Sequence, residues 1–187
     1  CWGYNGYGQL GNGTTTDRMT TTPVTGITAA VQMAGGQYHT CARLTDSTVR
    51  CWGYNGYGQL GDGTTTQRTT PVTVSGLSGV TQIEAGVYHT CALRNDGTVW
   101  CWGYNGYGTL GDGTTTTRYT PVQVSGLFNV VQIAAGRYHT CAVIADGTAR
   151  CWGYDAYGGL GNGTSGGSYT PVTVTGLTGV TRITAGY

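Results

Sequence analysis

Cysteine and histidine are the residues of this sequence best suited to chemistry, and both recur every 50 residues. His39, His89 and His139 keep this spacing. Six of the seven cysteines form Cys-x₉-Cys pairs, and the seventh, Cys1, has no partner in the sequence. Thiols at this spacing could form disulfides, stay free, or bind zinc together with a histidine. The three pairs are Cys41 with Cys51, Cys91 with Cys101, and Cys141 with Cys151.

The geometry of a β-hairpin favours disulfides among these three alternatives. Around Asn95-Asp96-Gly97, a three-residue loop with Gly97 in the left-handed conformation pairs Arg94 with Thr98. Counting back from that pair, Cys91 faces Cys101 at a non-hydrogen-bonded site, where the side chains are closest. A disulfide fits there and indicates an oxidising compartment. Zinc remains an alternative, with His89 beside the two thiols, although the usual close spacing of structural zinc ligands is missing.

Other motifs give no support for catalysis or for a cofactor. The sequence has no serine or aspartate at a spacing that would pair with a histidine, and its single glutamate cannot form a carboxylate pair. The glycine motif G-x-G-x-x-G occurs at 6–11, 56–61 and 106–111, but poor helix formers follow it each time. We therefore expect tight turns in place of a dinucleotide site, and we expect no enzyme activity, no cofactor and no metal.

The elements that must position these residues are short strands in a tandem repeat. The repeats are 1–50, 51–100, 101–150 and the incomplete 151–187, which we expect to be cut from a longer array. One period predicts strands at 80–85, 89–94, 98–103 and 120–125, with a glycine-rich loop over 105–117. Four short strands per 50 residues is typical of a β-propeller blade. The predicted fold class is all-β, a partial propeller of just under four repeats.

Composition excludes several other classes of protein. Glycine supplies 35 of 187 residues without a collagen period, charged residues are only 9% and the net charge is +1. A chain without a basic face is not expected to bind nucleic acid. No apolar run is long enough for a membrane span. Aromatic residues reach 11%, which argues against disorder.

One repeat resembles the regulator of chromosome condensation repeat. The motif residues are Ala85-Gly86-Val87-Tyr88-His89-Thr90-Cys91-Ala92-Leu93, then Asp96-Gly97-Thr98-Val99, Trp102-Gly103-Tyr104-Asn105 and Gly108-Thr109-Leu110-Gly111-Asp112-Gly113. The resemblance covers the whole chain and implies a propeller of four-stranded blades, usually seven. It also implies a structural histidine whose ring is tied to backbone groups. Such propellers serve as interaction platforms, among them a nucleotide exchange factor for a small GTPase on chromatin and a secreted β-lactamase inhibitor.

The repeated loops carry aromatic residues that could form a binding surface. We expect Trp2, Trp52, Trp102 and Trp152 to pack between blades. The tyrosines either pack with them or form a repeated rim that binds protein or sugar. This candidate binding rim comprises Tyr4, Tyr7, Tyr54, Tyr57, Tyr104, Tyr107, Tyr154 and Tyr157.

The same loops contain candidate glycosylation sites. Asn12 and Asn162 each begin an Asn-Gly-Thr sequon. Thr14, Thr64 and Thr114 lie in threonine-rich, nearly uncharged runs that suit O-linked sugars.

Together these features predict a non-enzymatic extracellular or cell-surface scaffold. Because the same groups recur in each repeat, we expect a protein or glycan partner, or further copies of the chain in a filament. One alternative is an intracellular propeller that regulates a small GTPase or binds chromatin. A further alternative is a secreted enzyme inhibitor.

Overall fold

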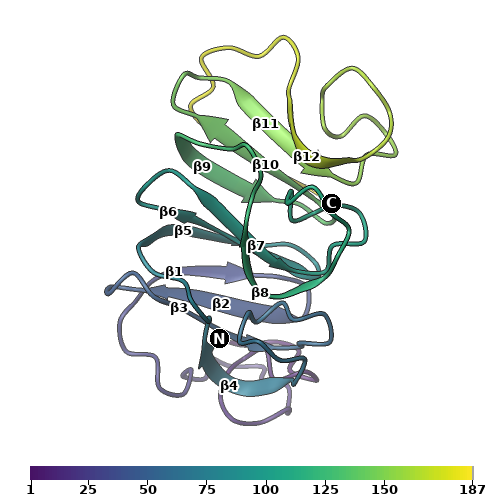
Figure 1. Cartoon of the computed structure of the whole chain (residues 1–187). Coiled ribbons are helices and arrows are strands. Elements are labelled where there is room, and N and C mark those ends of the chain that lie inside the picture. The colour runs from purple at the N-terminus through teal and green to yellow at the C-terminus, as the bar shows by residue number, and fades with distance from the viewer. Residues whose placement is uncertain (187) are drawn as a thin grey trace.

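The computed structural model describes residues 1–186, which form twelve strands in three four-stranded antiparallel sheets. Each sheet, with its loops, is one blade, and the blades stand side by side along the chain (Figure 1). Their strand order follows the sequence. The first blade comprises β1 (Ala30–Gly35), β2 (His39–Leu44), β3 (Val49–Gly53) and β4 (Arg68–Thr73). The second comprises β5 (Val80–Ala85), β6 (His89–Arg94), β7 (Val99–Gly103) and β8 (Arg118–Gln123). The third comprises β9 (Val130–Ala135), β10 (His139–Ile144), β11 (Ala149–Gly153) and β12 (Ser168–Thr173).

The predicted hairpin and its register are confirmed. Leu93 pairs with Val99 and Cys91 with Cys101, while Gly97 has a φ of 75°. Asp96 stabilises the turn, since its carboxylate accepts hydrogen bonds from the backbone N–H and the hydroxyl of Thr98. Such Asx turns explain why the loop is short and the register fixed.

The fourth strand begins two residues earlier than predicted. β8 starts at Arg118 because Arg118 pairs with Gly103 across an irregularity in the register. The Arg118 guanidinium also lies 2.8 Å from the Asp112 carboxylate in the preceding loop. The strand propensities of single residues do not predict this ion pair.

Each blade draws on two successive sequence repeats. The first blade runs from Ala30 to Thr73, across the repeat boundary at residue 50. Residues before Ala30 form no named strand, and only Gly3 and Arg18 make an isolated bridge. The described residues therefore contain three complete sheets, although the sequence holds almost four repeats.

Buried tryptophans join the blades, as predicted for three of the four. Trp52, Trp102 and Trp152 are fully buried, and each indole N–H donates to a carbonyl of the preceding segment or blade. Trp2 differs, because 68% of its surface is exposed.

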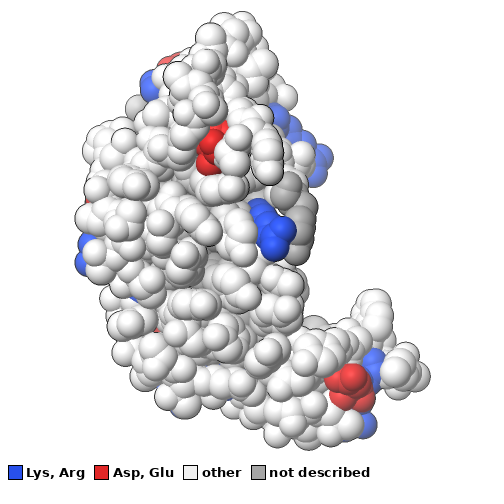
Figure 2. Space-filling model, turned by 90° about the vertical axis from the view of Figure 1, so that its right-hand side faces the viewer, with Lys and Arg blue, Asp and Glu red and all other residues white. Residues whose placement is uncertain are grey.

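Three glutamines also connect neighbouring blades. Gln82 of β5 donates to the Ile133 carbonyl (2.8 Å) and accepts from the Ile133 N–H (2.9 Å). Gln32 bonds to Ile83 in the same way, and Gln132 to Ile183. Each amide thus satisfies both backbone groups of an isoleucine 51 residues later. The resulting body is a curved stack with a hollowed side and few charged residues on the face in view (Figure 2).

All six paired cysteines form disulfides within their blades. The pairs are Cys41–Cys51, Cys91–Cys101 and Cys141–Cys151, each linking the second strand to the third. Cys1 is free. Because both thiols of each pair are bonded to each other, they are not available as zinc ligands beside the histidines. Of the residues described, none form a group of three or more potential metal ligands.

Candidate functional site

Ten tyrosine rings form a continuous row across the blades, which we call the tyrosine face. Neighbouring rings lie 4.9–6.5 Å apart between centroids, mostly edge to face. This geometry is favourable for aromatic pairs and holds each ring in place. None of the ten is fully buried. The rings are Tyr4, Tyr7, Tyr38, Tyr54, Tyr57, Tyr88, Tyr104, Tyr107, Tyr138 and Tyr154.

The structure brings together seven of the eight tyrosines of the predicted rim and adds three. Tyr157 makes no ring contact with residues 1–186 and is 97% exposed. Tyr38, Tyr88 and Tyr138 were missed because they lie outside the glycine-rich loops from which the rim was predicted. These three tyrosines recur every 50 residues, and that spacing could have identified them as part of the repeated surface. Each ring packs between rings of the neighbouring loops.

Three phenols near the middle of the tyrosine face are held in their neutral form. Burial, followed by the neighbouring tyrosines, raises the pKa of Tyr54, Tyr88 and Tyr104 above its usual value. The face therefore combines apolar rings with polar hydroxyl groups. Such a surface suits partners that present both apolar contact and hydrogen-bonding groups.

A buried asparagine organises each loop that carries these rings. The Asn55 amide donates to the carbonyls of Thr64 and Thr66, and its oxygen accepts from the Leu60 N–H. Asn5 and Asn105 make equivalent bonds. In the fourth repeat Asp155 takes this position.

The candidate glycosylation residues belong to the same loop networks. Thr64 and Thr114 donate their hydroxyls to Asp62 and Asp112, and Thr14 to Asn12. An O-linked sugar would remove that hydroxyl hydrogen, so the structure gives these threonines a structural role. Asn162 is half-buried and accepts from Thr164 in the same manner. The two sequons stay predictions.

Arginine and aspartate pair in two of these loops. Asp62 contacts Arg68 at 2.9 Å. Burial acts to raise the pKa of Asp62, but hydrogen bonds from Thr64 and Arg68 outweigh it and hold the pKa below its usual range. Asp62 and Asp112 bond a threonine and an arginine of their own loops, so these carboxylates stabilise the loops.

His39 and His89 are structural, but the partner of each ring is a side chain and not the backbone. Nε2 of His39 lies 2.9 Å from the Thr90 hydroxyl of the next blade, and Nε2 of His89 lies 3.0 Å from that of Thr140. Burial lowers the pKa of His39 to about 4 and that of His89 to about 3. Both rings are neutral at pH 7. The expected contact between these rings and the backbone is wrong. The threonine hydroxyl lies between the two groups: it contacts the histidine ring and donates to the carbonyl of Gln59 or Thr109.

The glycine motifs form turns. Gly58 and Gly61 have positive φ angles of 76° and 69°, and the segment closes through a hydrogen bond from the Gly61 N–H to the Gly58 carbonyl. No helix follows any of the three motifs. Among residues 1–186 no helix is long and apolar enough to cross a membrane.

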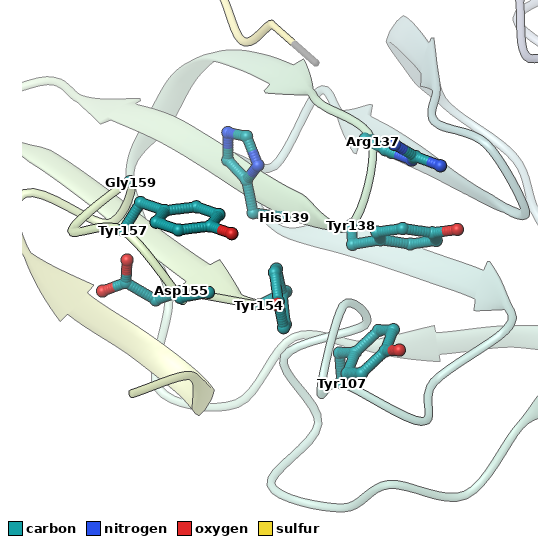
Figure 3. Close-up of a pocket in the computed structure, with 9 residues that line it drawn as sticks. Tyr107, Arg137, Tyr138, His139, Tyr154, Asp155, Tyr157 and Gly159 are labelled. Atoms are coloured by element: carbon teal, nitrogen blue, oxygen red, sulfur yellow. The ribbon is translucent and has the colours of Figure 1, made fainter. Parts of the chain in front are cut away.

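A cavity of about 520 Å³ lies at the third blade, where the tyrosine face reaches Tyr154. Tyr107, Tyr138, Tyr154 and Tyr157 contribute rings to it (Figure 3). Arg137, His139 and Asp155 contribute polar groups. Part of the predicted rim therefore borders a concave site.

Comparisons with known proteins agree with this architecture. Models of the regulator of chromosome condensation (RCC1) repeat match residues 1–43, 46–93 and 96–143, and a second model of this repeat matches 30–59, 80–109 and 130–158. No curated protein matches the chain.

Solved structures of the same fold are about twice as long as this chain. Human WBSCR16 is 26% identical with a TM-score of 0.86, over 99% of this chain and 50% of that protein. Prp20p of Saccharomyces cerevisiae, described with its binding properties to Gsp1p and histones, is 23% identical with a TM-score of 0.72, over 80% of this chain and 39% of that protein. With three matched repeats and three four-stranded blades, the chain belongs to the regulator of chromosome condensation (RCC1) repeat family.

Proposed function

We propose that this chain is a non-enzymatic scaffold of an extracellular or cell-surface compartment, and that its tyrosine face binds a protein or a glycan. The observation that carries the proposal is the row of ten rings in mutual contact. Tyrosine offers a large, rigid contact area at low entropic cost, which is why binding surfaces are rich in it. Neighbouring rings hold one another, so the surface is preorganised.

The three disulfides support the oxidising compartment. Proteins keep such bonds in secreted or extracellular environments, whereas cytosolic thiols stay reduced. The single glutamate, Glu84, hydrogen-bonds Gln82, and burial raises the pKa of its carboxyl. It has no carboxylate partner, so a paired acid and base is not part of the proposal.

The intracellular alternative has weaker support. The likeness to Prp20p at 23% identity indicates the fold and no partner. A histone-binding surface would need an acidic excess, and this chain has a net charge of +1. A secreted enzyme inhibitor would be one form of the protein-binding scaffold proposed here.

The compartment can be tested on protein isolated from its natural source without reductant. Alkylation followed by peptide mapping should leave the six cysteines of the three pairs unmodified before reduction and modify all six after it. Modification of these six thiols before reduction would contradict the oxidising compartment.

Binding can be tested with the double variant Tyr54→Ser, Tyr57→Ser on arrays of glycans and of extracellular proteins. We expect the double variant to bind at least tenfold more weakly to each arrayed glycan or protein that the natural chain binds. The control is Phe128→Ser, an exposed aromatic away from the tyrosine face. Unchanged binding by the double variant, or a control that loses as much, would contradict the proposal.

A further inference from the structure

We propose that Tyr57 is a site of oxidative cross-linking, at which its ring couples to Tyr88 or Tyr104 and joins the first blade covalently to the second. The centroid of the Tyr57 ring lies 5.0 Å from that of Tyr88 and 5.1 Å from that of Tyr104. Tyr57 belongs to the loop between β3 and β4, whereas Tyr88 precedes β6 and Tyr104 follows β7. The site therefore lies at an internal junction of two complete blades.

Local contacts hold the rings of this junction in place before any oxidation. The Tyr57 N–H donates to the Gln59 side chain (3.0 Å), and the Tyr104 N–H donates to the Tyr88 carbonyl (2.9 Å). A Cβ atom at Gly106 would be 2.2 Å from the Tyr104 hydroxyl, so that ring packs over its own loop. Reacting groups that are held close together react much faster than the same groups free in solution.

The coupling is the ordinary one-electron chemistry of phenols. A haem peroxidase that uses hydrogen peroxide removes one electron and one proton from each of two tyrosine hydroxyls. The two phenoxyl radicals then form one carbon–carbon bond between the ring positions next to the hydroxyls. The hydrogens on those two carbons move as protons to the oxygens, which restores both phenols. One hydrogen peroxide takes up the two electrons and the two protons and becomes two water molecules.

Tyr57 is the ring of this junction that an oxidant reaches most easily. It is exposed, whereas Tyr88 and Tyr104 are half-buried and Trp102 is fully buried. A second radical can form on another exposed ring and reach Tyr88 or Tyr104 by electron transfer between rings in contact. The paired cysteines are already disulfides, so no thiol of these pairs competes for the oxidant.

The same arrangement recurs at the other two junctions, but not at every exposed tyrosine. Tyr7 lies 5.0 Å from Tyr38, and Tyr107 lies 5.3 Å from Tyr138 (Figure 3). Tyr119 is 47% exposed, yet it makes no ring contact with residues 1–186. Because Tyr119 has no neighbouring ring with which to couple, it is the matched control.

This inference goes beyond binding, since it requires that an oxidant and not a partner reach the tyrosine face. The test treats the full chain with a haem peroxidase and limiting hydrogen peroxide at a series of protein concentrations. After reduction, cleavage after arginine places Tyr57, Tyr88 and Tyr104 on three different peptides. Mass spectrometry then finds linked peptides by the loss of two hydrogen atoms, and fragmentation identifies the coupled rings.

We expect the peptide of Tyr57 to be linked to that of Tyr88 or Tyr104 within one molecule, at a yield that does not depend on protein concentration. Tyr57→Phe keeps the ring but has no phenol hydrogen, so the yield should fall at least tenfold while the melting temperature changes little. Tyr88→Phe combined with Tyr104→Phe should remove the same links from the other blade, and Tyr119→Phe should leave the yield within twofold.

No linked peptides, an equal yield in Tyr57→Phe, or links only between molecules would overturn the proposal. If array binding depends on Tyr54 and Tyr57 while no link forms, the proposed function stands and this site is wrong. If the link forms and nothing binds, the reverse holds.

Discussion

Glycine at three equivalent loop positions determines where tyrosine rings can lie. A Cβ atom at Gly56 would be 2.2 Å from the Tyr54 hydroxyl, and Gly6 and Gly106 meet Tyr4 and Tyr104 in the same way. In the fourth repeat this position is Ala156, and Tyr154 is exposed where Tyr54 and Tyr104 are half-buried. At Gly56 an added methyl group would meet the Tyr54 ring, which must move to make room for it.

We therefore expect Gly56→Ala to expose Tyr54 at small cost in stability. The atom it meets is the end of a side chain that can move, so the loss should be below about 1 kcal/mol. Nitration of Tyr54, measured by mass spectrometry, should rise severalfold. Gly53→Ala is the matched contrast, because its Cβ would lie 2.5 Å from a backbone carbonyl at a φ of +105°. That variant should lose about 3 kcal/mol or more, and equal losses would contradict this account.

The buried histidines make stability depend on pH. Their folded pKa values of about 4 and 3 lie below the unfolded value of 6.5, so the unfolded chain binds more protons between these limits. The stabilisation is complete above pH 6.5 and is lost as the pH falls towards 4.

At pH 4.5 each buried histidine should lower the free energy of unfolding by about 2 to 3 kcal/mol relative to pH 7. Urea unfolding at a series of pH values measures this loss. His89→Gln keeps a polar group at the site. It should make the free energy of unfolding depend less steeply on pH between 6.5 and 4.5, and substitution of the half-buried His139 should have a smaller effect. If the free energy of unfolding of His89→Gln depends on pH as steeply as that of the natural chain, a group other than His89 titrates in this range.

At the scale of elements, glutamine side chains hold one blade to the next. Gln82 bonds both the N–H and the carbonyl of Ile133, whose side chain is fully buried. Removal of the amide leaves two backbone groups without partners at a blade junction, which is more costly than the loss of an exposed hydrogen bond.

Gln82→Met keeps the length of the side chain but removes these bonds, and it should cost about 2 to 4 kcal/mol. Chemical denaturation measures the loss, and hydrogen exchange at the Ile133 amide locates it. Gln37→Ala, at an exposed glutamine, is the control and should change stability by less than about 0.5 kcal/mol. Protection of Ile133 that survives in Gln82→Met would contradict the role given to this bond.

The sequence predicted elements where contacts are local and failed where they cross blades. The hairpin around Asp96 and the Cys91–Cys101 pairing follow from a turn of three residues. The glutamine bridges and the threonine partners of the histidines join residues 51 positions apart, which no local pattern specifies. Three tyrosines were missed for the same reason, because the rings that they contact lie 31 positions away in the chain.

At the scale of the molecule, the two ends of the described chain present surfaces that internal junctions bury. Trp2 is 68% exposed and Met19 90%, while the equivalent Trp52 is fully buried. At the other end, a Cβ on Gly158 or Gly163 would meet nothing, whereas one on Gly58 would meet Tyr119 of the next blade. The apolar groups at one end therefore match the open glycine surface at the other.

We expect this chain in isolation to associate end to end, because such contacts would repeat those between blades and do not require closure. Light scattering should show a mass that rises with concentration above 19.5 kDa. The double variant Trp2→Ser, Met19→Ser should shift the association midpoint at least tenfold to higher concentration, and Phe128→Ser should not shift it. Both substituted side chains are exposed, so the melting temperature should change little, which separates lost association from lost folding. A mass that stays at 19.5 kDa at all concentrations would contradict end-to-end contact and would favour a chain whose exposed ends do not match.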